Sequence, residues 1–151
     1  ELVKRFSYLC YTTAKKLRYN EVMAKGIYVY LGFKDGDSWY KRHLFKEPFG
    51  DDRKLFENAM LIFNQRPKDK IISMASITCY HLHKAEQTNM QLELFHDRLK
   101  DEVITETIDD INEVFGNQTI MMATALGAHG VVKQKVPFGS TKYLELLCRQ
   151  N

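Results

Sequence analysis

Carboxylates are the first residues in this 151-residue chain to consider for catalysis. General acid–base chemistry and two-metal phosphoryl transfer both require carboxylates that converge in a pocket. Three pairs of aspartates are close in the sequence, namely Asp35/Asp37, Asp51/Asp52 and Asp109/Asp110. The first pair lies in a predicted turn, the second at the start of a predicted helix and the third on a predicted helix, so each has a structural explanation. The sequence also has no glycine-rich phosphate loop of the Walker or dinucleotide type. We therefore expect no catalytic residues in this chain.

Histidines and a cysteine in one predicted strand raise the question of metal binding. Cys79, His81 and His83 are spaced two apart, which places them on one face of a strand. His43 or His96 could complete a metal shell, but the spacing lacks the paired cysteines of a structural zinc site. A metal-dependent enzyme built on these residues is the weakest alternative, and we expect neither a metal nor a cofactor.

Cations gather in the predicted second strand and around the start of the third. Residues 38–46 read SWYKRHLFK, with cations and aromatic residues on both faces. On an uncovered sheet face, such side chains could pair with phosphate oxygens and hold a duplex without reading its sequence. The alternative is a charged strand that protects a sheet edge from aggregation.

Charge is divided unevenly along the chain. The net charge is +7 over residues 1–84, −7 over residues 85–130 and +3 over residues 131–151. The basic first part suggests a polyanionic partner, although a solvated surface would explain it as well. The cysteines Cys10, Cys79 and Cys148 are few and widely spaced, which favours a reducing compartment such as the cytoplasm. No apolar run is long enough to span a membrane, so we expect no membrane partner.

A short apolar segment lies in the polar connector over residues 85–98. Gln91, Leu92, Leu94 and Phe95 offer one amide for orientation and three apolar anchors for a groove on a partner. The alternative is that these anchors pack back on the domain.

The elements that must position these residues follow the order helix, strand, strand, helix, strand. Apolar spacing predicts a helix over residues 2–19, and alternation predicts a hairpin over residues 26–45 around an Asp-Gly-Asp turn. A helix beginning at Asp51 or Asp52 precedes a third strand over residues 71–83. This order predicts an α+β fold, with a small antiparallel or mixed sheet, two helices on one face and the other face open.

The remainder of the chain is predicted to be a helix and an irregular tail. Residues 99–115 have a helical pattern with Ile104, Ile108, Ile111 and Phe115 on one face. Residues 119–125 favour a short strand. We divide the chain into a sheet domain over residues 1–84, a connector over residues 85–98, and a C-terminal helix and tail over residues 99–151.

Taken together, these features resemble the little-finger domain, the C-terminal domain of bacterial Y-family translesion DNA polymerases. The resemblance covers about residues 1–125. It rests on the element order, Phe45-Lys46-Glu47-Pro48, the strand over residues 71–82, Gln-Leu-x-Leu-Phe, and the acidic helix over residues 108–116. Residues 136–143 look loosely like the end of the mutagenesis-protein branch.

The resemblance implies that the sheet lies in the major groove of a primer–template duplex and grips its phosphates. It assigns this role to Lys41, Arg42, His43, Lys68, Lys70 and Ser73. The charge pattern of the strands adds Lys34 and Lys46 to the candidate DNA-binding residues. The resemblance also implies that Gln91, Leu92, Leu94 and Phe95 dock in the groove of the sliding clamp. The parent polymerase would need Mg²⁺ on carboxylates of a palm domain that this chain does not include, so the chain itself would bind DNA without catalysis.

Two departures from the family pattern stand out. The family domain usually begins with a strand before its first helix, whereas this chain opens with the helix; we expect a trimmed piece whose exposed sheet edge would allow dimerisation. Trp39 and Leu44 also occupy positions that are often Arg or Thr in the family. The main alternative function is a free-standing module that binds RNA or a protein.

Overall fold

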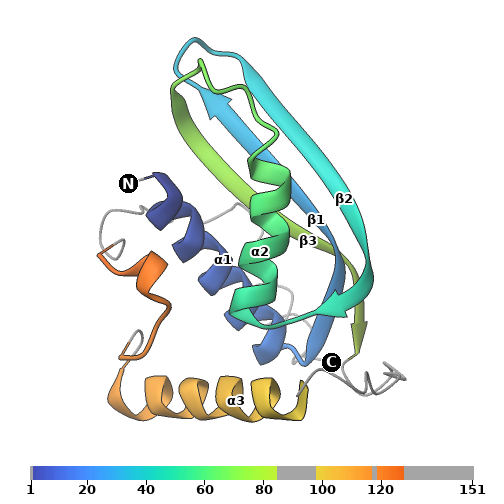
Figure 1. Cartoon of the computed structure of the whole chain (residues 1–151), viewed down its shortest axis with the longest axis vertical. Helices are drawn as coiled ribbons and strands as arrows, with labels where there is room; N and C mark the ends of the chain where they lie inside the picture. The colour runs from blue at the N-terminus through green and yellow to red at the C-terminus, as the bar shows by residue number, and fades with distance from the viewer. Residues whose placement is uncertain (1, 85–97, 117–118, 128–151) are drawn as a thin grey trace, which may run out of the picture.

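The computed structural model describes residues 2–84, 98–116 and 119–127, and shows a sheet with two helices on one face (Figure 1). The elements are α1 (Leu2–Tyr19), β1 (Val22–Phe33), β2 (Ser38–Phe49), α2 (Asp52–Phe63), β3 (Ile72–Lys84), α3 (Arg98–Phe115) and the 3₁₀ turn η2 (Ala123–Ala125). The three described strands are antiparallel in the order β2-β1-β3, so β2 and β3 form the sheet edges. The predicted α+β fold is confirmed.

The hairpin of β1 and β2 forms around the predicted turn. Gly36 has a φ of 87°, which suits a residue without a Cβ. The Phe33 N–H donates to the Asp37 carbonyl at 2.9 Å and closes the turn. Both strands extend beyond the predicted hairpin, and a register shift between Ala24 and Gly26 lets the far end of β2 bend toward α2.

The core lies between the sheet and the helices α1 and α2. Ile27, Val29 and Leu31 of β1 are fully buried there. The rings of Phe6 from α1 and Phe63 from α2 stack with centroids 4.3 Å apart, which joins the two helices above the sheet. The alternation seen in the sequence of β1 is therefore the alternation between core and open side.

Helix α2 begins as predicted. The Asp51 carboxylate accepts a hydrogen bond from the Lys54 N–H at 2.7 Å, which satisfies one of the free donors of the first turn. The helix ends at Phe63, just before Arg66 and Pro67.

Helix α1 is buried on two sides. Phe6, Cys10, Ala14 and Leu17 belong to the sheet core, whereas Ser7, Tyr8 and Tyr11 are buried outside it. The Ser7 Oγ lies 2.9 Å from the Thr124 Oγ1, so this second side faces η2. The segment after α3 therefore folds back onto the first helix.

The prediction of a strand over residues 119–125 is wrong. The Asn112 side chain accepts a hydrogen bond from the Ile120 N–H and donates one to its carbonyl, both at 2.9 Å. Because this amide satisfies both backbone groups, residue 120 needs no neighbouring strand, and the segment ends in the 3₁₀ turn η2.

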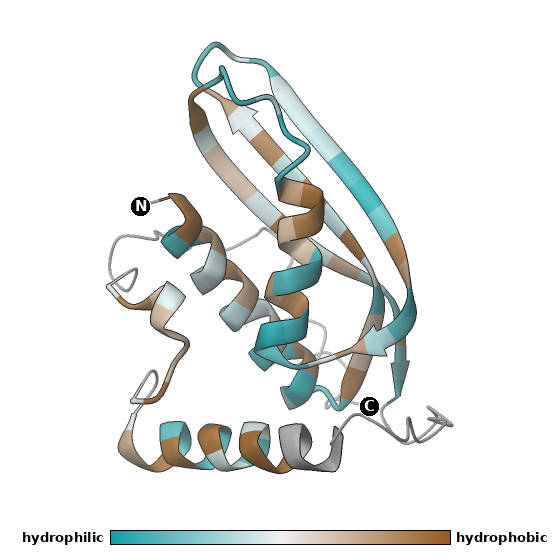
Figure 2. Ribbon diagram, viewed as in Figure 1, coloured by the Kyte–Doolittle hydropathy of each residue, from teal (hydrophilic) through white to brown (hydrophobic). Residues whose placement is uncertain are grey.

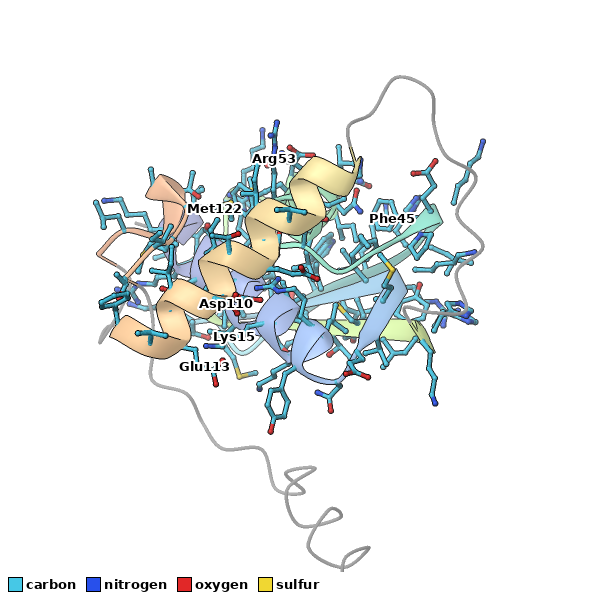
Figure 3. The ribbon with its side chains drawn as sticks, turned by 90° about the horizontal axis from the view of Figure 1, so that it is seen from below. Lys15, Phe45, Arg53, Asp110, Glu113 and Met122 are labelled. Atoms are coloured by element: carbon cyan, nitrogen blue, oxygen red, sulfur yellow. The ribbon has the colours of Figure 1, made fainter. Side chains whose placement is uncertain are left out.

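The predicted helix over residues 99–115 is confirmed as α3, whose apolar face is only partly buried. It crosses the lower ends of α1 and α2 (Figure 3). Phe115 is 74% exposed and Ile104 is also exposed, whereas the polar Asn112 is only 1% exposed. The contacts of the helix are polar. Asp109 accepts from the Arg18 guanidinium, and the Asn112 amide bonds the backbone of Ile120.

Candidate nucleic-acid interface

The strand register separates the candidate cations of β2. Residues directly opposite each other on antiparallel strands share a face of the sheet. Lys41 and His43 pair with the buried Val29 and Ile27, so they lie on the face that the helices cover. Arg42 lies on the opposite, open face. Figure 2 shows that the middle of β2 is hydrophilic.

Contacts agree with this placement. The Lys41 ammonium donates to the Gln65 side-chain oxygen, just beyond the end of α2. The His43 ring packs against Phe45 at 4.6 Å. Trp39, one of the departures from the family pattern, pairs with Leu31 and also lies on the covered face.

The side of the sheet away from the helices carries four cross-strand rows, which we call the open face. Their members are Ser38–Gly32–Met74, Tyr40–Tyr30–Ser76, Arg42–Tyr28–Thr78 and Leu44–Gly26–Tyr80. Tyr40 is 66% exposed, and its ring lies 5.9 Å from that of Tyr28. Leu44, the other departure from the family pattern, lies on this face.

Gly26 shapes one end of the open face. A Cβ at this position would lie 2.3 Å from the Cζ atom of Tyr80. The Tyr80 ring therefore lies across the bare backbone of Gly26, in space that any other residue would occupy. This close approach explains a glycine in the middle of a strand.

Lys70 and Ser73 are already engaged within the protein. The Lys70 ammonium lies 3.0 Å from the Asp35 carboxylate and 2.5 Å from that of Asp37. The hydrogen bonds to Asp37 and Asp35 raise the pKa of Lys70. The Ser73 hydroxyl donates to the Gly32 carbonyl at 3.1 Å. These two residues hold the β1–β2 turn against the start of β3.

Lys34, Lys46 and Lys68 are exposed at the margins of the sheet. Lys34 follows β1 at the turn, Lys46 lies near the end of β2, and Lys68 lies in the loop before β3. The structure thus brings the predicted cations to the sheet but spreads them over its two faces and its margins.

The sequence of this chain matches a known protein family. Residues 1–94 match the C-terminal domain of the impB/mucB/samB family. The chain belongs to this family. The match confirms the resemblance to the C-terminal domain of Y-family translesion polymerases that the sequence indicated.

Two curated relatives are DNA polymerases. This impB/mucB/samB family chain is 25% identical over 122 residues to DNA polymerase IV of Bacillus velezensis, which covers 80% of the chain and 30% of the relative. It is 23% identical over 128 residues to DNA polymerase IV 1 of Bacillus subtilis, with 83% and 31% covered. The chain spans less than a third of the length of these relatives.

The structure of this impB/mucB/samB domain describes three of the candidate metal ligands in β3 and His43 in β2. Among the residues that the structure describes, no group of three His, Cys, Asp or Glu side chains could hold a metal ion. Cys79 pairs with Ile27 on the covered face, and burial raises the pKa of its thiol to about 12. His81 has a φ of 52°, which interrupts the strand geometry that the motif assumed.

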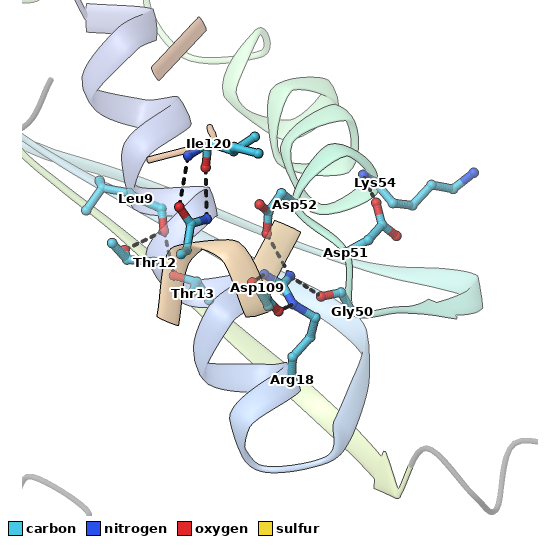
Figure 4. Close-up of polar contacts among 11 residues, drawn as sticks. Leu9, Thr12, Thr13, Arg18, Gly50, Asp51, Asp52, Lys54, Asp109 and Ile120 are labelled. Atoms are coloured by element: carbon cyan, nitrogen blue, oxygen red, sulfur yellow. Dashed lines mark hydrogen bonds and ion pairs between the residues drawn. The ribbon is translucent and has the colours of Figure 1, made fainter. Parts of the chain in front are cut away.

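Sequence reasoning missed Arg18 at the end of α1, which binds two other segments of the chain (Figure 4). Its guanidinium donates to the Asp52 carboxylate at 2.7 Å and to the Gly50 carbonyl at 3.2 Å. It also donates to both carboxylate oxygens of Asp109, at 2.5 and 2.9 Å. Arg18 thus joins α1, the start of α2 and α3.

The electrostatics of this cluster reflect two carboxylates sharing one guanidinium. Burial alone would lower the pKa of Arg18, but the hydrogen bonds to Asp109 and the attraction of Asp52 raise it. Burial raises the pKa of Asp52 against the attraction of Arg18, and the nearby Asp109 adds to the increase. No local pattern in the sequence connects Arg18 with a residue 91 positions later.

The predicted clamp-binding residues Gln91, Leu92, Leu94 and Phe95 lie outside the described residues, as does His96. In the part of the chain that the structure does describe, no helix has the length and apolar character needed to cross a membrane.

Proposed function

We propose that this chain is the duplex-DNA-binding domain of a translesion DNA polymerase and that its open face holds the primer–template backbone. The observation that carries the proposal is a sheet face that no described helix covers, in a domain whose relatives are named DNA polymerases. The polymerase activity and its Mg²⁺ would belong to parts of the parent protein beyond this domain, and the parent would act in the cytoplasm.

Arg42 is the central cation of the proposed interface. It lies on the open face, and it has no ion-pair partner among the described residues. Lys34, Lys46 and Lys68 would contact phosphates from the margins. Phosphate contacts of this kind position a duplex and carry no sequence information.

Lys41, His43, Lys70 and Ser73 complete the proposed set in a different way. Lys41 and His43 would reach DNA only around the edge of β2, because they start on the covered face. Lys70 and Ser73 would act mainly by holding the turn and the start of β3 in place.

The connector would bind a second partner. We propose that Gln91, Leu92, Leu94 and Phe95 dock in the groove of a sliding clamp, with the amide setting orientation and the apolar side chains filling the groove. The exposed edges of β2 and β3 would also allow a second copy to pair with the sheet.

Fluorescence anisotropy with duplexes of several sequences over a salt series tests the DNA proposal. Arg42→Ala should weaken binding similarly for all sequences and flatten the slope of log K against log salt by about one unit. Arg53→Ala is the matched control, because it removes the same charge from an exposed position on α2. Equal effects of the two substitutions, or a loss confined to one sequence, would refute the assignment.

A double variant separates the two proposed partners. Leu94→Ala with Phe95→Ala should abolish clamp binding and leave DNA affinity nearly unchanged. An equal loss of DNA affinity would show that these side chains pack on the domain instead.

One observation favours a protein- or RNA-binding module as the second candidate. Leu44 and Met74 are exposed on the open face. Their apolar side chains cannot bind phosphate, but they could contact a protein or an unpaired base. Stronger binding to single-stranded RNA than to duplex DNA in the same assay would favour this alternative.

A further inference from the structure

The open face is rich in hydroxyl groups and poor in charge. Of its twelve positions, seven carry a hydroxyl and one, Arg42, carries a charge. The hydroxyl-bearing residues are Tyr28, Tyr30, Ser38, Tyr40, Ser76, Thr78 and Tyr80. Most of the net positive charge of residues 1–84 therefore lies outside these twelve positions.

None of these seven hydroxyls makes a hydrogen bond to another described residue. Elsewhere the same chemical group is engaged, as in the Ser73 bond to the Gly32 carbonyl and the Ser7 contact with Thr124. A surface of unengaged hydroxyls offers several donors and acceptors to a ligand at once.

Aromatic packing holds part of this surface in place before any ligand binds. The Tyr28 and Tyr40 rings lie 5.9 Å apart at an angle of 32°. The Tyr80 ring lies across Gly26 and 5.4 Å from the ring of His81. Because a tyrosine has only two rotatable side-chain bonds, such packing presents its hydroxyl at a small entropic cost.

We infer that the open face binds the phosphate and sugar oxygens of nucleic acid mainly through neutral hydroxyl donors, with the tyrosines at its centre. This inference rests on the proposed DNA-binding function and specifies its chemistry. A cation that neutralises a phosphate releases a counterion and steepens the salt dependence of binding, whereas a hydroxyl releases none. The tyrosines should therefore contribute affinity that salt does not screen.

The test is a triple variant, Tyr28→Phe with Tyr30→Phe and Tyr40→Phe, which removes three hydroxyls and keeps every ring. Its affinity for duplex DNA should fall at least about tenfold at every salt concentration, since each hydrogen bond contributes roughly threefold to tenfold. The slope of log K against log salt should stay the same. Tyr19→Phe is the matched control, because Tyr19 is exposed at the end of α1 and does not belong to the open face, so this variant should bind as the wild type does.

Each outcome separates this inference from the proposed function. Wild-type affinity in the triple variant, together with weakened binding in Arg42→Ala, would overturn the hydroxyl inference and leave DNA binding intact. A triple variant whose salt slope also flattens would overturn it as well, since the lost contacts would then be ionic. If the wild type itself binds no duplex DNA, the proposed function fails first and the inference fails with it.

A second variant guards against an effect of the rings on the fold. Ser76→Ala with Thr78→Val changes β3 alone and should weaken binding severalfold with the same unchanged slope. Wild-type affinity in this variant would restrict the hydroxyl contacts to the tyrosines and refute the inference for the β3 side of the face.

Discussion

Helix α3 should undock from the domain more often when the ion pair between Arg18 and Asp109 is broken. The perturbation is Asp109→Asn, which keeps the size of the side chain and removes its charge. The two side chains are 18% and 28% exposed, so solvent screens the pair only in part. Two charge-assisted hydrogen bonds are weakened at once, and we expect a cost of about 2 kcal/mol.

The cost should appear locally and not in the whole domain. Arg18 keeps its bonds to Asp52 and to the Gly50 carbonyl, so the junction of α1 and α2 remains closed. A loss of about 2 kcal/mol corresponds to a roughly 30-fold larger undocked population. Amide hydrogen exchange in α3 should accelerate by about that factor, while exchange in the central strand β1 should stay the same.

An exposed ion pair provides the control. The Arg53 guanidinium lies 3.1 Å from the Glu57 carboxylate on the surface of α2, and Glu57→Gln should leave exchange in α3 unchanged. Unchanged exchange of α3 in Asp109→Asn would show that other contacts hold the helix. Equal acceleration in α3 and β1 would show that Arg18 stabilises the whole core.

Two further predictions concern the open face and the hairpin turn. Gly26→Ala should displace the Tyr80 ring and lower the free energy of unfolding by about 1 kcal/mol in urea titrations. In a Tyr80→Ala background, the same change should leave the free energy of unfolding unchanged. A full cost in that background would contradict the steric explanation. The hydrogen bond from Lys70 lowers the pKa of Asp37 below 3.8, so the stability that this carboxylate contributes is present above that pH and is lost as pH falls through the lowered value. Lys70→Met should move the NMR titration midpoint of Asp37 upward, and an unmoved midpoint would show that the backbone N–H of Ser38 alone causes the shift.

Local features of the sequence predicted most of the fold. The helices over residues 2–19 and 99–115 follow from apolar spacing, and the start of α2 follows from one capping aspartate. These signals depend on residues within a few positions of each other, which is the distance over which backbone geometry and capping act. The family match then confirms what the order of these elements indicated.

The site was predicted less completely, because its composition depends on register. In β2 the segment SWYKRHLFK shows no clear alternation of apolar and polar residues. Its cations could therefore have lain on either side of the sheet. The pairing with β1 assigns Arg42 to the open face and Lys41 to the covered one. The sequence pattern led us to assign a role to the cations and none to the tyrosines, which the strand register brings together on one face.

The sequence by itself determined the element types, the α+β order and the family, since each of these depends on local periodicity and composition. Only the tertiary structure decided which side chains come together. It forms the hydroxyl-rich open face, the hydrogen bonds between the Asn112 amide and the Ile120 backbone, and the ion pair between Arg18 and Asp109. The physical reason is that these contacts join residues far apart in the chain. Their partners are selected by packing and strand register, which no local pattern records.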